Sequence, residues 1–177
     1  NWKLVQDYLP QKKEFSGILL LGAEEKKKIN LGSGFADRSK EIPYTDLSLC
    51  TIGSITKPMT ATAILRLSDK GKLGLHDKIT VYFKQVPKDK QGITIHHLLT
   101  HSSGLPGAIG DKYEKINAEN FQARAWEKPL FFTPGEGYEY SNVGYSLLGM
   151  IIEQVSGQSY SQFLQENIFQ PAGMTTA

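Results

Sequence analysis

Residues 53–71 read GSITKPMTATAILRLSDKG, and this stretch decides the organisation of the chain. Met59, Ala63 and Leu67 form one apolar stripe at helical spacing, and further alanine, isoleucine and leucine residues form a second stripe beside it. The pattern predicts a helix over residues 55–70 that is buried on nearly all sides. Gly71 lies where a left-handed C-terminal cap belongs, so the helix is expected to end there.

The segments before this helix have the composition of strands. Two β-type runs, at residues 15–22 and 29–35, are separated by the charged stretch 23–28, which predicts a hairpin with a solvated turn. A short helix over residues 2–9, ended by Pro10, is expected before them. A further strand is expected at 47–52, where Cys50, the single cysteine, would pack as a small apolar side chain.

The segments after the central helix are mostly helical. Helices are expected at residues 94–100, 111–126, 145–155 and 160–169, with an aromatic loop at 131–140. A length of 177 residues favours a single domain over 1–177, with strands within 15–35 and a helical region over 54–170. A two-stranded ribbon is marginal by itself, so the two strands are expected to need further strands.

Composition excludes several classes of function. The net charge is only +2, and arginine, the side chain best suited to clamping phosphates and reading bases, is scarce among the basic residues. Nucleic acid is therefore not expected as a partner. The longest purely aliphatic run, residues 18–21, is far shorter than the roughly 20 apolar residues of a membrane-spanning helix. No membrane span is expected.

Ser54 and Lys57 are the first candidate catalytic pair. Positions i and i+3 at the start of a helix share a face, so the hydroxyl and the amine can touch. Burial and the positive end of the helix would disfavour a protonated Lys57, which could then take the serine proton. The alternative is structural: Ser54 is an N-cap and Lys57 a solvated first-turn residue, and a Ser-x-x-Lys pattern arises about once by chance in such a composition.

Tyr140 and Asn142 are the second candidate pair. They follow the aromatic loop and precede a helix, so a phenol and a carboxamide can project into one cleft. A phenol beside a lysine can relay a proton to a leaving group, and a carboxamide can hold an acyl amide. The alternative is that Tyr140 packs within the aromatic loop while Asn142 caps the next helix.

Histidines and glycines give weaker patterns. His97 and His101 are spaced as an i, i+4 pair with His96 alongside, but no H-E-x-x-H motif is present, so packing or capping is expected instead of metal binding. The glycines at 32, 34, 104, 107 and 110 do not form a phosphate loop, because no G-K-[ST] follows them.

Four motifs in this order resemble the serine β-lactamase-like family, specifically its class C branch with penicillin-recognising D-Ala-D-Ala carboxypeptidases and esterases. The resemblance extends roughly from Phe15 to Met174. The segments that carry it are Gly53–Lys57, Leu98–Leu105, Pro134-Gly135 followed by Tyr140–Tyr145, and Phe169–Met174.

The resemblance implies both a mechanism and a fold. Ser54 would be the nucleophile of an acyl-enzyme on an amide, ester or lactam, and Lys57 its proton acceptor. Tyr140 would protonate the leaving group, and Asn142 would position the substrate and Lys57. The segment 100–104 would be a conformational signature without an accepted catalytic role. The implied fold is α+β, a helical cluster beside an antiparallel sheet, with no metal or organic cofactor and an extracytoplasmic location.

One departure from the family is large. Members continue with further strands and a third motif, a Lys or His followed by Thr or Ser and Gly, whose strand supplies the second oxyanion N–H; nothing here matches it. The sequence is thus expected to be the N-terminal portion of a longer domain, completed by a C-terminal segment or a partner chain. Two alternatives to the hydrolase stay open: a non-catalytic binding or sensing module, and an inactive truncated fragment.

Overall fold

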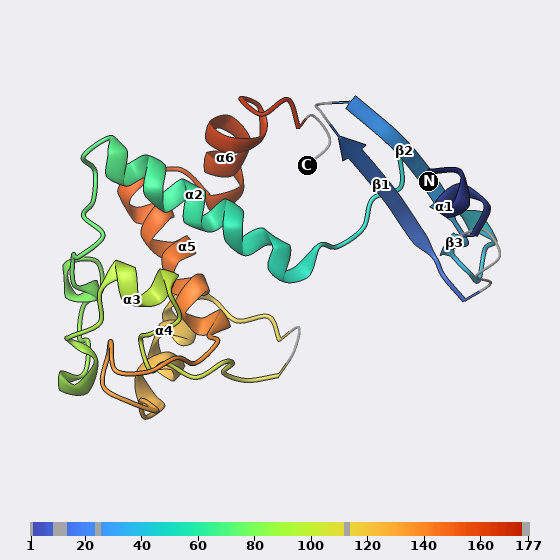
Figure 1. Ribbon diagram of the computed structural model, residues 1–177. Coiled ribbons are helices and arrows are strands. Elements are labelled where there is room, and N and C mark those ends of the chain that lie inside the picture. The colour runs from blue at the N-terminus through green and yellow to red at the C-terminus, as the bar shows by residue number, and fades with distance from the viewer. Residues whose placement is uncertain (1, 9–13, 24–25, 112–113, 175–177) are drawn as a thin grey trace. The chain divides into compact units, whose positions relative to one another are not determined.

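The computed structural model describes residues 2–8, 14–23, 26–111 and 114–174. The chain divides into two compact units, residues 1–52 and residues 53–177. The first unit is formed by helix α1 (Trp2–Tyr8) and two antiparallel strand pairs, and the second is helical (Figure 1). The content of helices and antiparallel strands confirms the α+β prediction. None of the helices among the described residues is long and apolar enough to span a membrane.

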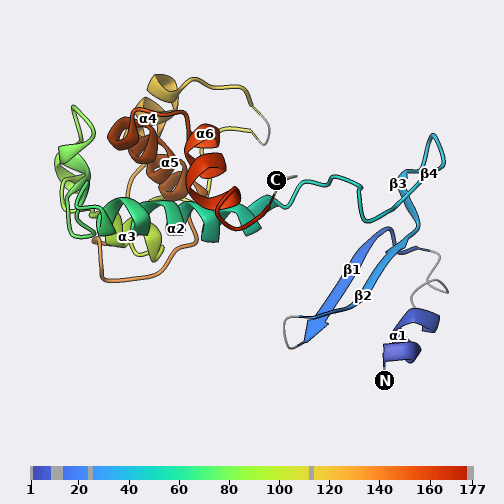
Figure 2. The same ribbon diagram turned by 90° about the horizontal axis from the view of Figure 1, so that it is seen from above.

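The hairpin of the first unit is formed by β1 (Gly17–Ala23) and β2 (Lys26–Ser33) (Figure 2). Leu19 faces Leu31 across the ladder, and the register shifts after Leu21. The expected turn over 23–28 was too long, because the ladder continues to the pair Ala23 and Lys26. Charged side chains suit the edges of a two-stranded ribbon and do not end it. The centre of that turn, residues 24–25, lies outside the described residues, as does the end expected for the first helix at 9–10.

The second strand run ends earlier than expected, because Gly34 breaks it. Its φ of +71° lies in the left-handed region, and a Cβ there would collide with the carbonyl oxygen of Phe15. The chain then forms β3 (Phe35–Asp37), which pairs with β4 (Ile42–Pro43) as a separate two-stranded sheet.

The strand expected at 47–52 does not form. Within the described part of the chain no strand pairs with this stretch, which is a turn followed by irregular backbone. Leu47 and Leu49 are more than four-fifths exposed, at 84% and 81%, and Cys50 is exposed as well. The expected packing of Cys50 was therefore wrong, because an apolar run becomes a buried strand only where a partner strand accepts its hydrogen bonds.

The second unit is built around α2 (Thr56–Asp69), which packs against α5 (Asn142–Ser156) and α6 (Tyr160–Leu164) (Figures 1 and 2). The helix ends as predicted, with Gly71 at a φ of +65° just beyond its C-cap. Burial on all sides was wrong, because Ala63, Ile64 and Leu67 face the core while Leu65 is 45% exposed.

Further helical segments of this unit, among the described residues, are α3 (Ile95–Leu99), α4 (Ala118–Glu127), a wider turn over Gln165–Phe169 that continues from α6, and two short 3₁₀ turns at Ile79–Val81 and Lys88–Lys90. Of the helix expected at 111–126, residues 112–113 lie outside the described residues and residues 114–117 are not helical. The helix begins at residue 118, because Asn117 caps it by accepting the backbone N–H of Asn120. The core between these helices is aliphatic, with fully buried side chains that include Ile64, Ile79, Leu98, Leu105, Leu147, Leu148 and Ile151.

Candidate active site

Ser54 lies in a short turn, Gly53–Ile55, directly before α2, and its side chain is exposed. The N-cap of α2 is Ile55, which makes no side-chain capping bond. The structural alternative, in which Ser54 caps this helix, is therefore wrong. Its Oγ is instead an acceptor for the side chain of Lys57, one turn further along the helix.

Lys57 is the centre of the site. Its Nζ donates to Ser54 Oγ over 3.2 Å and to Asn142 Oδ1 over 2.6 Å. The second bond joins the first turn of α2 to the first turn of α5, which are 85 positions apart in the sequence. Lys57 is half-buried. The catalytic interpretation expected a buried amine and the structural alternative a solvated one, and the structure lies between the two.

Tyr140 lies against the same amine. The ring centroid of Tyr140 is 4.7 Å from Lys57 Nζ, and that of Tyr145, on α5, is 5.5 Å away. Hydrogen bonding to the Lys57 side chain, and then to that of Ser54, lowers the pKa of Tyr140. The structural alternative required Tyr140 to be packed inside the aromatic loop, but the side chain is 41% exposed. This side chain therefore lies beside Lys57 and is partly open to solvent.

Ser141 is the residue that sequence reasoning missed. It is 1% exposed and is the N-cap of α5, accepting the backbone N–H of Gly144 over 3.0 Å. Its hydroxyl also donates to the carbonyl oxygen of Pro106 over 2.7 Å. The cap expected at Asn142 was therefore wrong by one residue, and this releases the Asn142 carboxamide for Lys57. Serine is among the preferred N-caps, so its identity was the signal that could have shown this.

The segment 101–107 is hydrogen-bonded to the segment that carries Tyr140. Backbone hydrogen bonds run from Gly135 to Ser102, from Glu139 to His101 and from Asn142 to Gly107, with N···O distances of 2.8, 2.9 and 3.0 Å. The resemblance assigned no catalytic role to residues 100–104. In the structure these residues support the segment that carries Tyr140, because that segment is joined to them by backbone hydrogen bonds.

The histidines lie in packing and capping roles. The Nδ1 of His97 accepts the backbone N–H of Thr94 and completes the N-terminal capping box of α3. His101 accepts the backbone N–H of Ser141 at its Nδ1 over 3.0 Å. Across the residues that the structure describes, no group of three or more His, Cys, Asp or Glu side chains is arranged to hold a metal ion.

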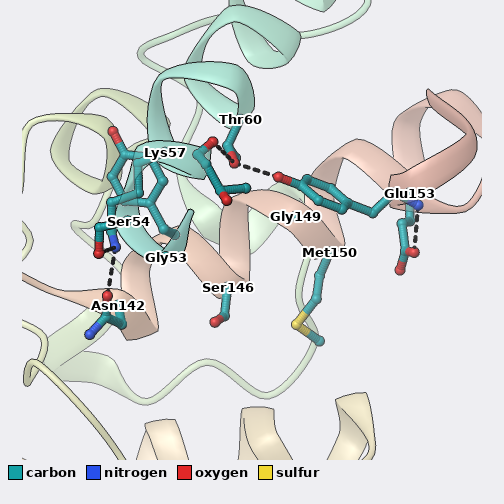
Figure 3. A pocket seen from close by; sticks show the side chains of 12 residues that line it. Gly53, Ser54, Lys57, Thr60, Asn142, Ser146, Gly149, Met150 and Glu153 are labelled. Carbon is teal, nitrogen blue, oxygen red and sulfur yellow. Dashed lines mark hydrogen bonds between the residues drawn. The ribbon is translucent and has the colours of Figure 1, made fainter. Parts of the chain in front are cut away.

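A pocket of about 530 Å³ opens beside Ser54 and Lys57 and continues between α2 and α5 (Figure 3). Ser146, Gly149, Met150 and Glu153 of α5 line its far part. Thr60 is hydrogen-bonded there to the Tyr160 hydroxyl over 2.6 Å. The nucleophile candidate thus lies at the mouth of a space large enough for a small molecule.

Comparison with known proteins identifies relatives of this chain. The sequence profile of the family named Beta-lactamase matches residues 5–177. Penicillin-binding protein 4* of Bacillus subtilis is 37% identical over 174 residues, which is 94% of this chain and 38% of that protein. The chain therefore spans about two-fifths of the length of this curated relative.

Solved structures give the same result. A penicillin-binding protein from Bacillus halodurans superposes with a TM-score of 0.80 at 29% identity, covering 98% of this chain and 55% of the other. A D-amino acid amidase from Ochrobactrum anthropi superposes with a TM-score of 0.79 at 31% identity, covering 98% of this chain and 49% of the other. The prediction that the sequence resembles the N-terminal portion of such proteins is confirmed.

Proposed function

Because this chain belongs to the beta-lactamase family, we propose that it is a serine hydrolase that forms an acyl-enzyme on Ser54. Its substrates would be small molecules or peptides with an amide, ester or β-lactam bond. A family of penicillin-binding proteins and an amidase supports the reaction class, and the choice among the three bonds remains part of the proposal.

The observation that supports the proposal most directly is the pair of hydrogen bonds made by one amine. Lys57 Nζ lies 3.2 Å from Ser54 Oγ and 2.6 Å from Asn142 Oδ1. A nucleophile within hydrogen-bond reach of a base, with that base oriented by a third group, is the arrangement that activates a serine.

The first half of the reaction is acylation. Ser54 Oγ attacks the substrate carbonyl carbon while its hydroxyl proton passes to Lys57 of the Lys57 and Tyr140 pair. The carbonyl π electrons move to oxygen, where the positive end of the α2 dipole stabilises the developing charge. The bond to the leaving nitrogen or oxygen then breaks, and Tyr140 delivers the proton to it.

The second half is hydrolysis of the ester on Ser54. A water molecule attacks the ester carbonyl, gives up its proton to the Lys57 and Tyr140 pair, and Ser54 leaves with a proton as the acid is released. The proposal includes an extracytoplasmic location, because the relatives are penicillin-binding proteins. It also includes completion of the sheet by a further segment or a partner chain.

Covalent labelling tests this function. A labelled penicillin and a labelled fluorophosphonate are applied to this chain and to a longer chain that contains it. We expect label on Ser54, its loss in Ser54→Ala, and no loss in the control Ser161→Ala, which removes an exposed serine of α6. Lys57→Ala should slow acylation by about 10²–10⁴-fold, the contribution of a general base.

The outcomes separate the candidate functions. Label that appears and is then released supports the hydrolase. Label that stays on Ser54 without turnover replaces the hydrolase with a binding or sensing module. If the longer chain is not labelled by either probe, or if Ser54→Ala is labelled as fast as the native protein, the proposed function is wrong.

A further inference from the structure

We propose that His101 is a positioning residue that holds Tyr140 against Lys57, and that it does so only in its neutral form. The inference rests on the proposed function, since it assigns Tyr140 a part in that reaction. His101 itself does not contact Ser54 in this proposal and acts through the segment that carries the tyrosine.

The backbone N–H groups of the two residues that flank Tyr140 are both bonded to this one histidine. The backbone N–H of Glu139 donates to the His101 carbonyl oxygen over 2.9 Å, and that of Ser141 donates to His101 Nδ1 over 3.0 Å. The backbone on each side of Tyr140 is thereby fixed, and with it the direction in which the phenol leaves the chain.

The imidazole ring also packs against the tyrosines of the site. Its centroid is 4.6 Å from that of Tyr140 and 5.1 Å from that of Tyr145, with interplanar angles of 35° and 34°. Tyr145 is fixed in turn, because its hydroxyl donates to the carbonyl oxygen of Leu99 over 3.0 Å. Tyr140 is thus held at its backbone by hydrogen bonds and at its ring by a stacked surface.

The backbone at His101 is strained, with a φ of +59°. Residues other than glycine occupy this left-handed region at a cost, which persists only where surrounding contacts fix the conformation. Here the strained residue is the one that accepts both bonds around Tyr140. Strain of this kind gathers at functional sites, which agrees with a positioning role.

Neutrality is required by the bond at Nδ1. A ring nitrogen that accepts the Ser141 N–H carries no proton, so the proton of the neutral ring is on Nε2. Protonation would turn Nδ1 into a donor facing another donor and would break that bond. Burial, and then the charge of Lys57, lower the pKa of His101, so the ring stays neutral at neutral pH.

The groups that face His101 come from three elements. They are Lys57 of α2, Tyr138 and Tyr140 of the preceding loop, and Tyr145 of α5. Lys57 is the only cation in this set, and it adds to the cost of a second positive charge. As the pH falls below the ordinary range of histidine, His101 is therefore expected to take up a proton and lose its bond to the Ser141 N–H, so that Tyr140 is no longer held in position.

Two substitutions separate the acceptor from the strain. His101→Asn keeps an acceptor near the place of Nδ1 and tolerates positive φ, whereas His101→Gly tolerates positive φ but removes acceptor and ring. His96→Asn is the matched control, since His96 is exposed on the neighbouring helix. Circular dichroism and Trp126 fluorescence establish that each variant is folded before it is compared.

The first measurement does not depend on activity. Nitrogen-15 NMR of the imidazole is expected to show an unprotonated Nδ1 at neutral pH, and hydrogen exchange to show a protected Ser141 amide. Protection should be lost in His101→Gly and kept in His101→Asn. A protonated Nδ1 at neutral pH, or equal protection of the Ser141 amide in folded His101→Gly, overturns the proposal whether or not the protein is a hydrolase.

The second measurement is the rate of Ser54 acylation by the fluorophosphonate as a function of pH. His101→Gly should slow the acylation step by about 10²-fold, the cost of a 1 Å misplacement, with initial probe binding unchanged. His101→Asn should recover most of this rate and lose the acid limb that His101 contributes. A His101→Asn variant as slow as His101→Gly, or an unaltered acid limb, refutes the inference.

Discussion

Replacing Ser141 by alanine should destabilise the helical unit more than the loss of an ordinary helix cap. Ser141 Oγ accepts the N–H of Gly144 and donates to the Pro106 carbonyl, and the residue is 1% exposed. Loss of an N-cap costs about 1 kcal/mol. Loss of a second hydrogen bond costs about 1 kcal/mol more. We therefore expect a fall of about 2 kcal/mol in the free energy of unfolding.

Ser159 offers a matched control within the same unit. It caps α6 by accepting the N–H of Gln162 over 3.3 Å, but it is exposed, so Ser159→Ala should cost only about 0.5 kcal/mol. Urea unfolding is followed by Trp126 fluorescence in a Trp2→Phe background, which confines the signal to the helical unit. Equal shifts of the midpoint for the two alanine variants would refute the reasoning.

Two further predictions concern stability. Gly104→Ala should lower the free energy of unfolding by about 1–2 kcal/mol because of the φ of +77°, and further because the new Cβ collides with a facing backbone carbonyl. The control Gly71→Ala, with a φ of +65° and open space around it, should show only the first of these costs. Equal urea midpoints for the two variants would contradict this. Asp77 has a pKa lowered by the backbone N–H of Gly74 and by the Tyr82 hydroxyl. The ionised Asp77 carboxylate therefore stabilises the fold above the ordinary aspartate pKa of 3.8, and this stabilisation is lost as the pH falls through the lowered pKa. The urea midpoints of the native protein and of Asp77→Asn should accordingly converge as the pH is lowered from about 5 to about 2.

The sequence predicted the helices that carry strong local signals. The apolar spacing of residues 55–70 and the position of Gly71 predicted α2 almost to the residue. The stop at Gly157 predicted the end of α5 at Ser156, although this helix begins at Asn142, three residues before the expected start. These features depend on interactions within a few positions along the chain, and such interactions can be inferred from one sequence.

Features that depend on distant partners were predicted less well. Residues 47–52 are apolar enough for a strand but have no pairing strand among the described residues. The exposure of Leu65 follows from what packs on α2 and not from the helix itself. The bond from Ser141 was out of reach for the same reason, since its partner lies 35 positions away. The bond from Lys57 to Asn142, across 85 positions, was expected only from the family resemblance.

The candidate site residues were predicted from motifs, and the structure brings Ser54, Lys57, Tyr140 and Asn142 together. The labelling experiments test the roles of these residues. The motifs did not show which of the neighbouring residues Ser141 and Asn142 caps α5 and which one binds Lys57. Capping falls to Ser141, which leaves the adjacent carboxamide free to bind the amine.

The bonds between residues 101–107 and the segment that carries Tyr140 also bring the two ends of the intervening chain close together. The N–H of Phe131 is bonded to the carbonyl of Gly104, and that of Asn142 to the carbonyl of Gly107. The described residues between these bonds, 108–111 and 114–130, therefore begin and end beside the site. Doubling the length of a flexible loop costs only about 0.6 kcal/mol in closure entropy. We therefore expect a change in length between Gly110 and α4 to leave the arrangement of Lys57, Tyr140 and Asn142 unchanged.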